Sequence, residues 1–225
     1  MSRLVYLDSS VLVIDKSSGE AVAGRRADQK SLAHYWRTFL REPRLQPVHR
    51  IDQPVAGLVV WARTAEVFSR LHGHLQDGHM TREYIAVVDT PPSPQSGTLN
   101  DRIAVDKSGN RSRIDPAGKQ SELTYETIGS TQHHTILLIR LRTGRHHQIR
   151  AQLGHRGWHV VGDTKYGARR PLRDGGIALL AYTVKFPHPV HPVEIPCRAR
   201  FPQTSLWQAV SSAVIGDVDL DRFEQ

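Results

Sequence analysis

One aspartate stands out because of the residues around it. Asp52 follows His49 and Arg50, and Gly57 begins an apolar run after four further residues. A carboxylate beside an arginine just before a strand could act as a nucleophile or a base, because the arginine favours its ionised form. Most Asp–Arg neighbours are instead exposed pairs that contribute little. On these residues alone, catalysis and a surface pair both remain open for Asp52.

A second polar stretch, residues 143–150, reads Thr-Gly-Arg-His-His-Gln-Ile-Arg. The spacing predicts a helix that begins near Thr143, carries Ile149 and Leu153 on its inner face, and ends at Gly154 or Gly157. The first turn of a helix attracts anions. Arg150 would lie beside the inner face, where a partly buried guanidinium requires a carboxylate partner. A phosphate contact or an exposed charge is the alternative for Arg150.

A tyrosine in a predicted strand is the third candidate. Residues 82–87 read Arg-Glu-Tyr-Ile-Ala-Val, and Tyr84 shares a face with the smaller Ala86 and Val88. These neighbours would leave the Tyr84 ring free for stacking on a base. A tyrosine buried in the core is the alternative.

The elements that must position these residues are predicted from periodicity and end signals. Ser31 and Thr64 are expected to cap two helices with apolar residues at helical spacing. Apolar and β-branched runs predict strands between turn signals. The predicted helices cover 31–41, 64–77, 143–154 and 204–214, and the predicted strands cover 4–7, 11–14, 57–63, 83–88, 121–128, 135–141 and 179–186. This order predicts an α+β fold on a mixed or antiparallel sheet.

Composition limits the class of protein. The chain has 225 residues, and 30 Lys+Arg against 22 Asp+Glu give a formal net charge of +8. The surplus favours nucleic acid as a partner, with a solvated basic surface as the alternative. No apolar run is long enough for a membrane span or a secretion signal. The single cysteine, Cys197, fits a reducing compartment, so we expect a soluble cytoplasmic protein.

The 13 histidines raise the question of a metal site. The candidate ligands are the pairs at 133–134 and 146–147 and the spaced pair His188 and His191. No cysteine cluster or HExxH pattern accompanies them, so we predict no functional metal.

Taken in order, these stretches resemble the RluA-type family of RNA pseudouridine synthases over roughly residues 4–201. The HRLD-x-x-T-S-G element of that family is similar to residues 49–57, where Gln-Pro-Val-Ala precedes Gly57 instead of the usual Thr-Ser pair. The other similar elements are the tyrosine strand at 82–87, K-x-A-x-T-x-Y at 119–125, TGR-x-HQIR at 143–150 and GD-x-x-YG at 162–167. Five elements in register make the resemblance specific.

The resemblance implies a role for each candidate. Asp52 would be the catalytic aspartate, Arg150 would pair with Asp52, and Tyr84 would stack on the target base. Arg50 would fill the space left by the flipped uridine, since an enzyme must extrude a base before it can act on it. The remaining RNA-binding candidates are His49, which would also orient the loop, and Arg145, His147 and Gln148. No cofactor and no metal are implied, because the reaction is an isomerisation without redox change.

The resemblance also implies an architecture. We expect one catalytic domain over residues 1–215, with a central, mostly antiparallel mixed sheet and flanking helices and loops, and a C-terminal tail over 216–225. No N-terminal S4-type RNA-binding domain is expected. The expected partner is an rRNA or tRNA stem-loop, without a membrane or an obligate protein partner, and the chain is expected to be a monomer. A catalytically silent RNA-binding protein with the same fold is the main alternative, and a glycosidase a weaker one, since it would require a second carboxylate.

Overall fold

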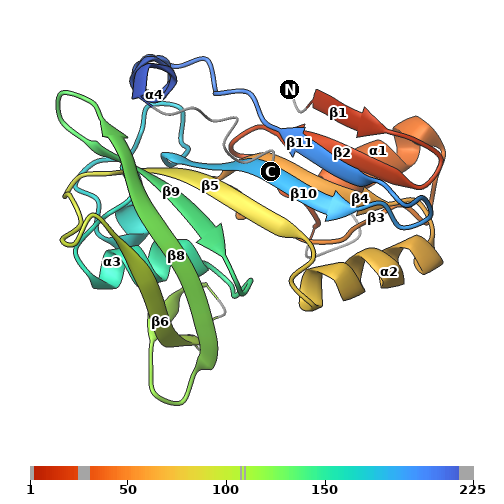
Figure 1. Cartoon of the computed structure of the whole chain (residues 1–225), viewed down its shortest axis with the longest axis horizontal. Coiled ribbons are helices and arrows are strands. Elements are labelled where there is room, and N and C mark those ends of the chain that lie inside the picture. The colour runs from red at the N-terminus through yellow and green to blue at the C-terminus, as the bar shows by residue number, and fades with distance from the viewer. Residues whose placement is uncertain (1–2, 25–30, 107, 109, 218–225) are drawn as a thin grey trace. The chain divides into compact units, whose positions relative to one another are not determined.

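The computed structural model describes residues 3–24, 31–106, 108 and 110–217, without the side chains of 215–217. The chain divides into two compact units, residues 1–83 with 180–200 and residues 84–179 with 201–225. The divisions fall inside one strand, β5, and after the first residue of another, β10. Each unit is described below by itself (Figure 1).

The first unit is a small sheet with two helices. Its strands lie in the order β1-β2-β4-β10, with β3 paired to β4 and β11 to β10. The strand bounds are β1 Arg3–Leu7, β2 Val11–Lys16, β3 Gln46–Pro47, β4 Ala56–Ala62, β10 Leu179–Pro187 and β11 Glu194–Arg198. All pairs are antiparallel except β4 with β10, which run parallel at Ala56 and Leu180.

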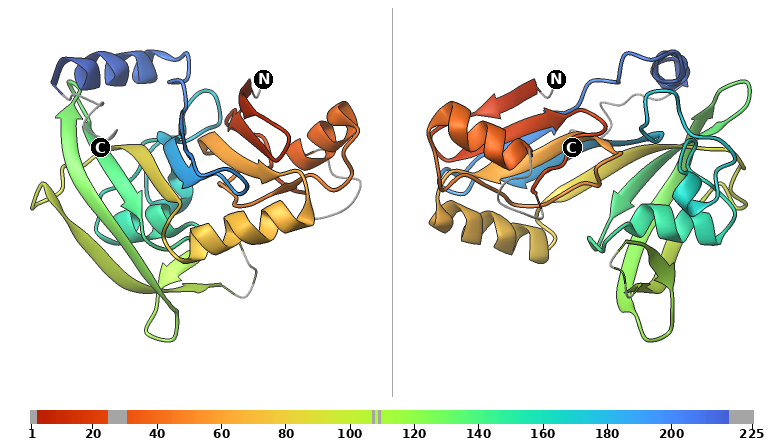
Figure 2. Two further views of the ribbon diagram at one scale, coloured as in Figure 1. Left: turned by 45° about the vertical axis from the view of Figure 1, so that its right-hand side comes forward. Right: turned by 180° about the vertical axis from the view of Figure 1, so that it is seen from behind.

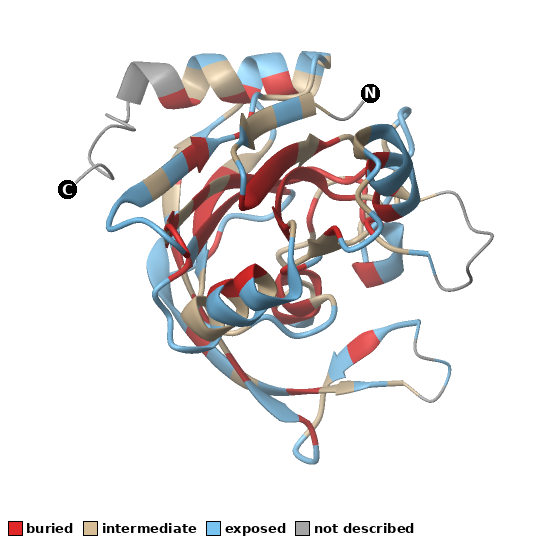
Figure 3. Cartoon of the chain, turned by 90° about the vertical axis from the view of Figure 1, so that its right-hand side faces the viewer, coloured by how far each residue is buried: buried red, intermediate tan, exposed pale blue. Residues whose placement is uncertain are grey.

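The burial of its residues fits the position of β4 between β2 and β10 in this sheet. All seven residues of β4 are buried, and β2 is buried at five of six positions (Figure 3). A strand covered on both faces reads as a continuous apolar run rather than an alternating one. The helix α2, Ala65–Gln76, packs against β4.

Both predicted helix caps of this unit are confirmed. The Ser31 side chain accepts a hydrogen bond from the backbone of His34 at the start of α1, Leu32–Leu40. The Thr64 side chain accepts one from Val67 at the start of α2. Each cap satisfies a backbone N–H that has no partner within the helix.

The second unit combines long antiparallel strands with helices (Figure 2). Its strand order is β5-β9-β8-β6-β7. The bounds are β5 Thr81–Val88, β6 Ser96–Val105, β7 Ser112–Ile114, β8 Lys119–Ser130, β9 Thr135–Leu141, α3 Gln148–His155, the 3₁₀ turn η1 Thr164–Tyr166 and α4 Ser205–Asp217. The helix α3 packs against β6, β7 and η1, and α4 packs against β8.

The sequence-based prediction was wrong about the start of α3. It placed the start near Thr143, whereas the helix begins at Gln148. The side chain of Gln148 accepts hydrogen bonds from the Thr143 hydroxyl and the Arg145 backbone, which hold the preceding residues as a loop. His147 adopts a left-handed conformation with φ of 52°, so the helix cannot extend back through it.

The architecture confirms an α+β fold whose strand pairs are mostly antiparallel and include the parallel pair of β4 with β10. Strand β6 was not predicted, because most of its residues are exposed and it lacks an apolar alternation. No helix in the described ranges is long and apolar enough to cross a membrane. The single catalytic domain over 1–215 stays a prediction, and most of the tail 216–225 lies outside the described residues.

Candidate active site

Asp52 lies half-buried in a turn that leads into β4. Its carbonyl accepts a hydrogen bond from the Val55 backbone at 3.0 Å. The next carbonyl, that of Gln53, accepts one from the ammonium group of Lys16 at 3.0 Å. These contacts to the carbonyls of Asp52 and Gln53 hold the loop at and directly after Asp52.

Lys16, at the end of β2, contacts the candidate site but was missed by the sequence interpretation. It is 1% exposed, and its ammonium also donates to the carbonyls of Ser17 and Glu20 at 2.9 and 3.0 Å. Burial lowers its pKa to about 8, while the Glu20 and Asp52 carboxylates act in the opposite direction. The available signal was a lysine that ends an apolar strand, where a charge needs partners.

Gly57 allows β4 and β10 to lie side by side next to this loop. Its φ is +115°, and a Cβ there would lie 2.2 Å from the Ala181 carbonyl oxygen. Only glycine avoids both the backbone strain and the contact. The glycine of the motif thus keeps the Asp52 loop at the start of a paired strand.

His49 is buried beneath the same loop, whereas Arg50 is exposed. The His49 Nε2 accepts a hydrogen bond from the Val60 backbone at 3.2 Å, so the hydrogen of the neutral ring is on Nδ1. Burial, and to a smaller extent the positive charge of Arg82, lowers the pKa of His49 to about 3. Within this unit, His49 therefore ties the loop to β4, and Arg50 reaches solvent.

Arg150, in α3, is held by a buried carboxylate. Its Nε and Nη2 donate to the two oxygens of Asp163 at 2.7 and 2.8 Å, and the side chains are 4% and 1% exposed. The guanidinium also lies 4.9 Å from the ring centre of Tyr166. The sequence interpretation required a carboxylate near Arg150 but did not name Asp163, whose place in the Gly-Asp-x-x-Tyr-Gly stretch was the available signal. The pairing of Arg150 with Asp52 involves residues of different units and stays a prediction.

The residues before α3 form a bonded loop. The Gln148 amide donates to the Glu122 carbonyl at 3.0 Å and is buried. The Thr143 hydroxyl is an acceptor for the Glu122 backbone N–H at 2.9 Å. Arg145 is exposed and donates to the Gln120 carbonyl at 3.1 Å. Gln148 thus shapes the loop from inside, and Arg145 lies on its outer side.

His147 joins this loop to η1. The Tyr166 hydroxyl accepts from the Ser112 backbone at 2.8 Å, so its own hydrogen is available to the His147 Nδ1, also at 2.8 Å. Burial, the positive charge of Arg150 and other nearby groups lower the pKa of His147 to about 3. The ring stacks on His146, with 3.7 Å between centres, and the Ser112 hydroxyl bonds the His146 carbonyl. A neutral His147 therefore helps to hold the loop against β7.

Tyr84 lies in β5 and is 5% exposed. Its small neighbour Ala86 is fully buried. The role of Tyr84 in stacking on a base stays a prediction. Arg82, two residues earlier, is buried as well, and its Nε has no hydrogen-bond partner in the described part of the chain.

The candidate metal ligands form pairs rather than sites. The rings of His188 and His191 stack with 4.7 Å between their centres, and His188 binds Asp8 at 2.8 Å. Among the described residues, no group of three or more His, Cys, Asp or Glu side chains could hold a metal ion.

Comparisons with known proteins agree with the motif arrangement. Residues 10–155 match the family model described as RNA pseudouridylate synthase. The ribosomal large subunit pseudouridine synthase D of Yersinia pestis is 34% identical over 228 residues, which cover 89% of this chain and 67% of that protein. The protein of the same name from Vibrio cholerae is 30% identical, covering 99% of this chain and 74% of the relative.

Solved structures share the fold. Human RNA pseudouridylate synthase domain containing 4 gives a TM-score of 0.73 at 18% identity, with 94% of this chain and 92% of the other covered. Human RNA pseudouridylate synthase domain containing 1 gives 0.71 at 20% identity, with 97% of each chain covered. The sequence matches over most of its length show that this chain belongs to the RNA pseudouridylate synthase family, the enzymes that isomerise uridine in RNA.

Proposed function

We propose that this chain converts uridine to pseudouridine in large-subunit ribosomal RNA, with Asp52 as the catalytic carboxylate. The ribosomal substrate is suggested by the names of the bacterial relatives. The observation that carries the role of Asp52 is the anchoring of its loop, through the Lys16 bond to Gln53 and the close strand pairing at Gly57. A group held in this way is oriented before the substrate binds. The proposal includes a monomer that acts in the cytoplasm.

The reaction requires a group that can attack or deprotonate the sugar. The bond between N1 of uracil and C1′ of the ribose breaks, the base turns, and C5 bonds to C1′. C5 then loses a proton and N1 gains one, so the product is an isomer and no oxidant or reductant is needed. A carboxylate can serve as the nucleophile or the base in these steps. Asp52 is proposed for this role.

Arg150 is proposed to keep Asp52 ionised. The bonds from Nε and Nη2 to Asp163 fix the plane of the guanidinium, which determines the direction of its third nitrogen, Nη1. A nearby positive charge favours the ionised form of a carboxylate. Asp163 and Tyr166 therefore act as positioning residues for Arg150.

The remaining candidates divide by exposure. Arg50 and Arg145 are exposed and are proposed to contact RNA, Arg50 by filling the space of the flipped uridine. His49 and Gln148 are buried and are proposed to act on RNA through the loops that they hold. His147 is proposed to act in the same way, and Tyr84 to stack on the flipped base.

The test is the substitution Asp52→Asn, which removes the charge and keeps the size. We expect no pseudouridine in a large-subunit rRNA transcript, mapped by chemical labelling, while RNA affinity changes little. Asp77→Asn, at an exposed position after α2, is the matched control and is expected to leave activity unchanged. An unchanged rate for Asp52→Asn would refute the proposed role. Retained binding without activity in the unsubstituted protein would favour an RNA-binding protein that does not catalyse.

A further inference from the structure

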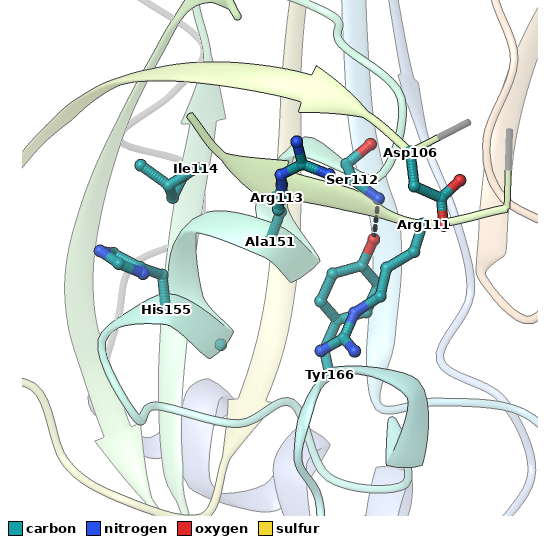
Figure 4. A pocket seen from close by; sticks show the side chains of 9 residues that line it. Asp106, Arg111, Ser112, Arg113, Ile114, Ala151, His155 and Tyr166 are labelled. Carbon is teal, nitrogen blue, oxygen red and sulfur yellow. Dashed lines mark hydrogen bonds between the residues drawn. The ribbon is translucent and has the colours of Figure 1, made fainter. Parts of the chain in front are cut away.

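A cavity of about 340 Å³ opens between α3 and β7. The described residues that line it all belong to the second unit, and none of these is among the predicted site residues. Figure 4 shows Ala151 and His155 of α3 on one side and Arg111 and Arg113 of the β7 segment on the other. A volume of this size is within the range of small-molecule sites.

The walls of the cavity are fixed by close contacts. A Cβ at Gly154 would lie 2.8 Å from the Tyr166 carbonyl oxygen, so α3 and η1 meet without space between them. The Tyr166 hydroxyl accepts from the Ser112 backbone at 2.8 Å, which fastens β7 to η1. The Ser112 hydroxyl also donates to the His146 carbonyl at 2.6 Å, which links β7 to the loop before α3. The cavity is therefore formed before any ligand binds.

Its floor is apolar. Ala151 and Tyr166 are 4% and 5% exposed and belong to one apolar cluster, against which Ile114 packs. An aromatic or heterocyclic ring that covers such a floor removes apolar surface from water. A nucleobase is a ring of this kind.

Its rim is mainly basic. The Arg111 guanidinium lies 5.2 Å from the Tyr166 ring centre, and Arg111 is exposed. The Arg113 side chain is 63% exposed and pairs with Asp115 at 2.8 Å. His155 is exposed at the end of α3. These groups suit phosphate oxygens.

One carboxylate also lines the cavity. Asp106 accepts hydrogen bonds from the Ser108 hydroxyl at 2.9 Å and the Asn110 backbone at 2.8 Å. These bonds hold the turn before β7. The Arg111 backbone lies beside Asp106, whose N–H donates to the Arg111 carbonyl at 2.8 Å, but the Arg111 guanidinium points away from Asp106 toward the Tyr166 ring (Figure 4). Asp106 would repel a phosphate placed directly beside it, so the phosphates are expected at the guanidinium ends of Arg111 and Arg113.

We propose that this cavity binds one unpaired nucleotide of the RNA substrate, with the base on the Ala151–Tyr166 floor and its phosphates at Arg111 and Arg113. The proposal rests on RNA as the substrate but not on the role of Asp52. It adds a recognition site to the residues proposed for catalysis. Unpaired bases on apolar and aromatic surfaces, with arginines along the backbone, are a general mode of RNA recognition.

The first experiment follows the methyl NMR signals of Ala151 and Ile114 in the full chain. Uridine 5′-monophosphate, uridine and inorganic phosphate are added as separate probes. We expect both methyl signals to shift with the nucleotide, less with uridine and not with phosphate. Shifts of equal size with phosphate and with the nucleotide would overturn the proposal, as would the absence of any shift with the nucleotide.

The second experiment measures the affinity of the double substitution Arg111→Gln and Arg113→Gln for a large-subunit rRNA transcript. The double variant and the protein with which it is compared both carry Asp52→Asn, so that binding is measured without turnover. We expect affinity to fall about ten-fold, as the loss of two phosphate contacts implies. Circular dichroism checks that the exposed substitutions leave the fold intact.

The matched control removes two arginines from the first unit, Arg3 and Arg70, each of which is paired with a carboxylate as Arg113 is. We expect little change in affinity for Arg3→Gln with Arg70→Gln. An equal loss in both double variants would mean that only total charge matters and would overturn the proposal. Failure of isomerisation in the unsubstituted protein would refute the proposed function. The binding comparison would still test the cavity, because it does not depend on turnover.

Discussion

The ion pair between Arg150 and Asp163 differs from the exposed ion pairs of the chain in its burial. Both side chains are at most 4% exposed, whereas Arg70 and Glu66 on α2 are 52% and 74% exposed. Removing one partner of a buried pair leaves an uncompensated charge that solvent cannot reach easily. The pair therefore matters for stability as well as for the direction of the guanidinium.

We expect Asp163→Asn to lower the free energy of unfolding by about 3–5 kcal/mol. The same change of charge in Glu66→Gln should cost less than about 1 kcal/mol, because its pair with Arg70 is exposed. Urea unfolding followed by circular dichroism measures both values. Equal losses for the two variants would contradict this account of the buried pair.

The buried histidines predict how stability depends on pH. Burial lowers the pKa of His49 from 6.5 to about 3, so the folded state binds fewer protons than the unfolded state between these values. Stability should therefore be complete above pH 6.5 and fall as the pH decreases toward 3, by about 1.4 kcal/mol per pH unit for one such group. His147 adds to the loss in the same window.

The variant His49→Gln isolates the contribution of His49 to the pH dependence of stability. An amide oxygen can still accept from the Val60 backbone but does not take up a proton. We expect the unfolding free energy of this variant to decrease less steeply with acidification than that of the unsubstituted chain. The measurement is a series of urea unfolding curves between pH 7 and about pH 5.5, where His titrates while Asp and Glu stay largely ionised. Parallel decreases would show that His49 is not the titrating group.

At the scale of elements, the parallel pairing of β4 with β10 depends on one glycine. Gly57 meets Ala181 backbone to backbone, and the Asp52 loop leads directly into this pairing. A side chain at this position would force the two strands apart. The position of the Asp52 loop and the integrity of the first unit are therefore linked.

We expect Gly57→Ala to cost about 3 kcal/mol or more, because its Cβ would lie 2.2 Å from the Ala181 carbonyl oxygen. Gly78→Ala is the matched control, since Gly78 also has a positive φ, +79°, but a Cβ there would meet no neighbouring atom within 4 Å. It should cost only about 1–2 kcal/mol of backbone strain. Thermal unfolding compares the two, and similar shifts in Tm would argue against a role for the strand contact.

At the scale of the whole molecule, the net charge of +8 should govern the association with RNA. Basic side chains that neutralise phosphates release counterions, so affinity falls as salt rises. We expect the affinity for an rRNA transcript to fall at least about ten-fold between about 50 and 200 mM KCl. Filter binding over this range is the measurement, with sucrose at equal osmolality as the control. An affinity independent of salt would show that the basic surplus does not contact the RNA.

Local features of the chain were predictable because their causes are local. The caps Ser31 and Thr64 and the apolar run of β4 depend on neighbouring residues, and the structure confirms them. The family, too, followed from motifs that are readable along the chain. The start of α3 was not predictable, because the side chain of Gln148 binds residues that precede it and also β8.

Taken by itself, the sequence determined the fold class, the family and the candidate residues, since residue types, spacing and periodicity carry them. The folded structure was needed to show that Asp163 pairs with Arg150 and that Lys16 bonds the Asp52 loop. It was also needed to find the cavity between α3 and β7. The physical reason is that each of these joins segments distant in the chain, and burial decides which charged groups must be paired there. No spacing along the sequence records that requirement.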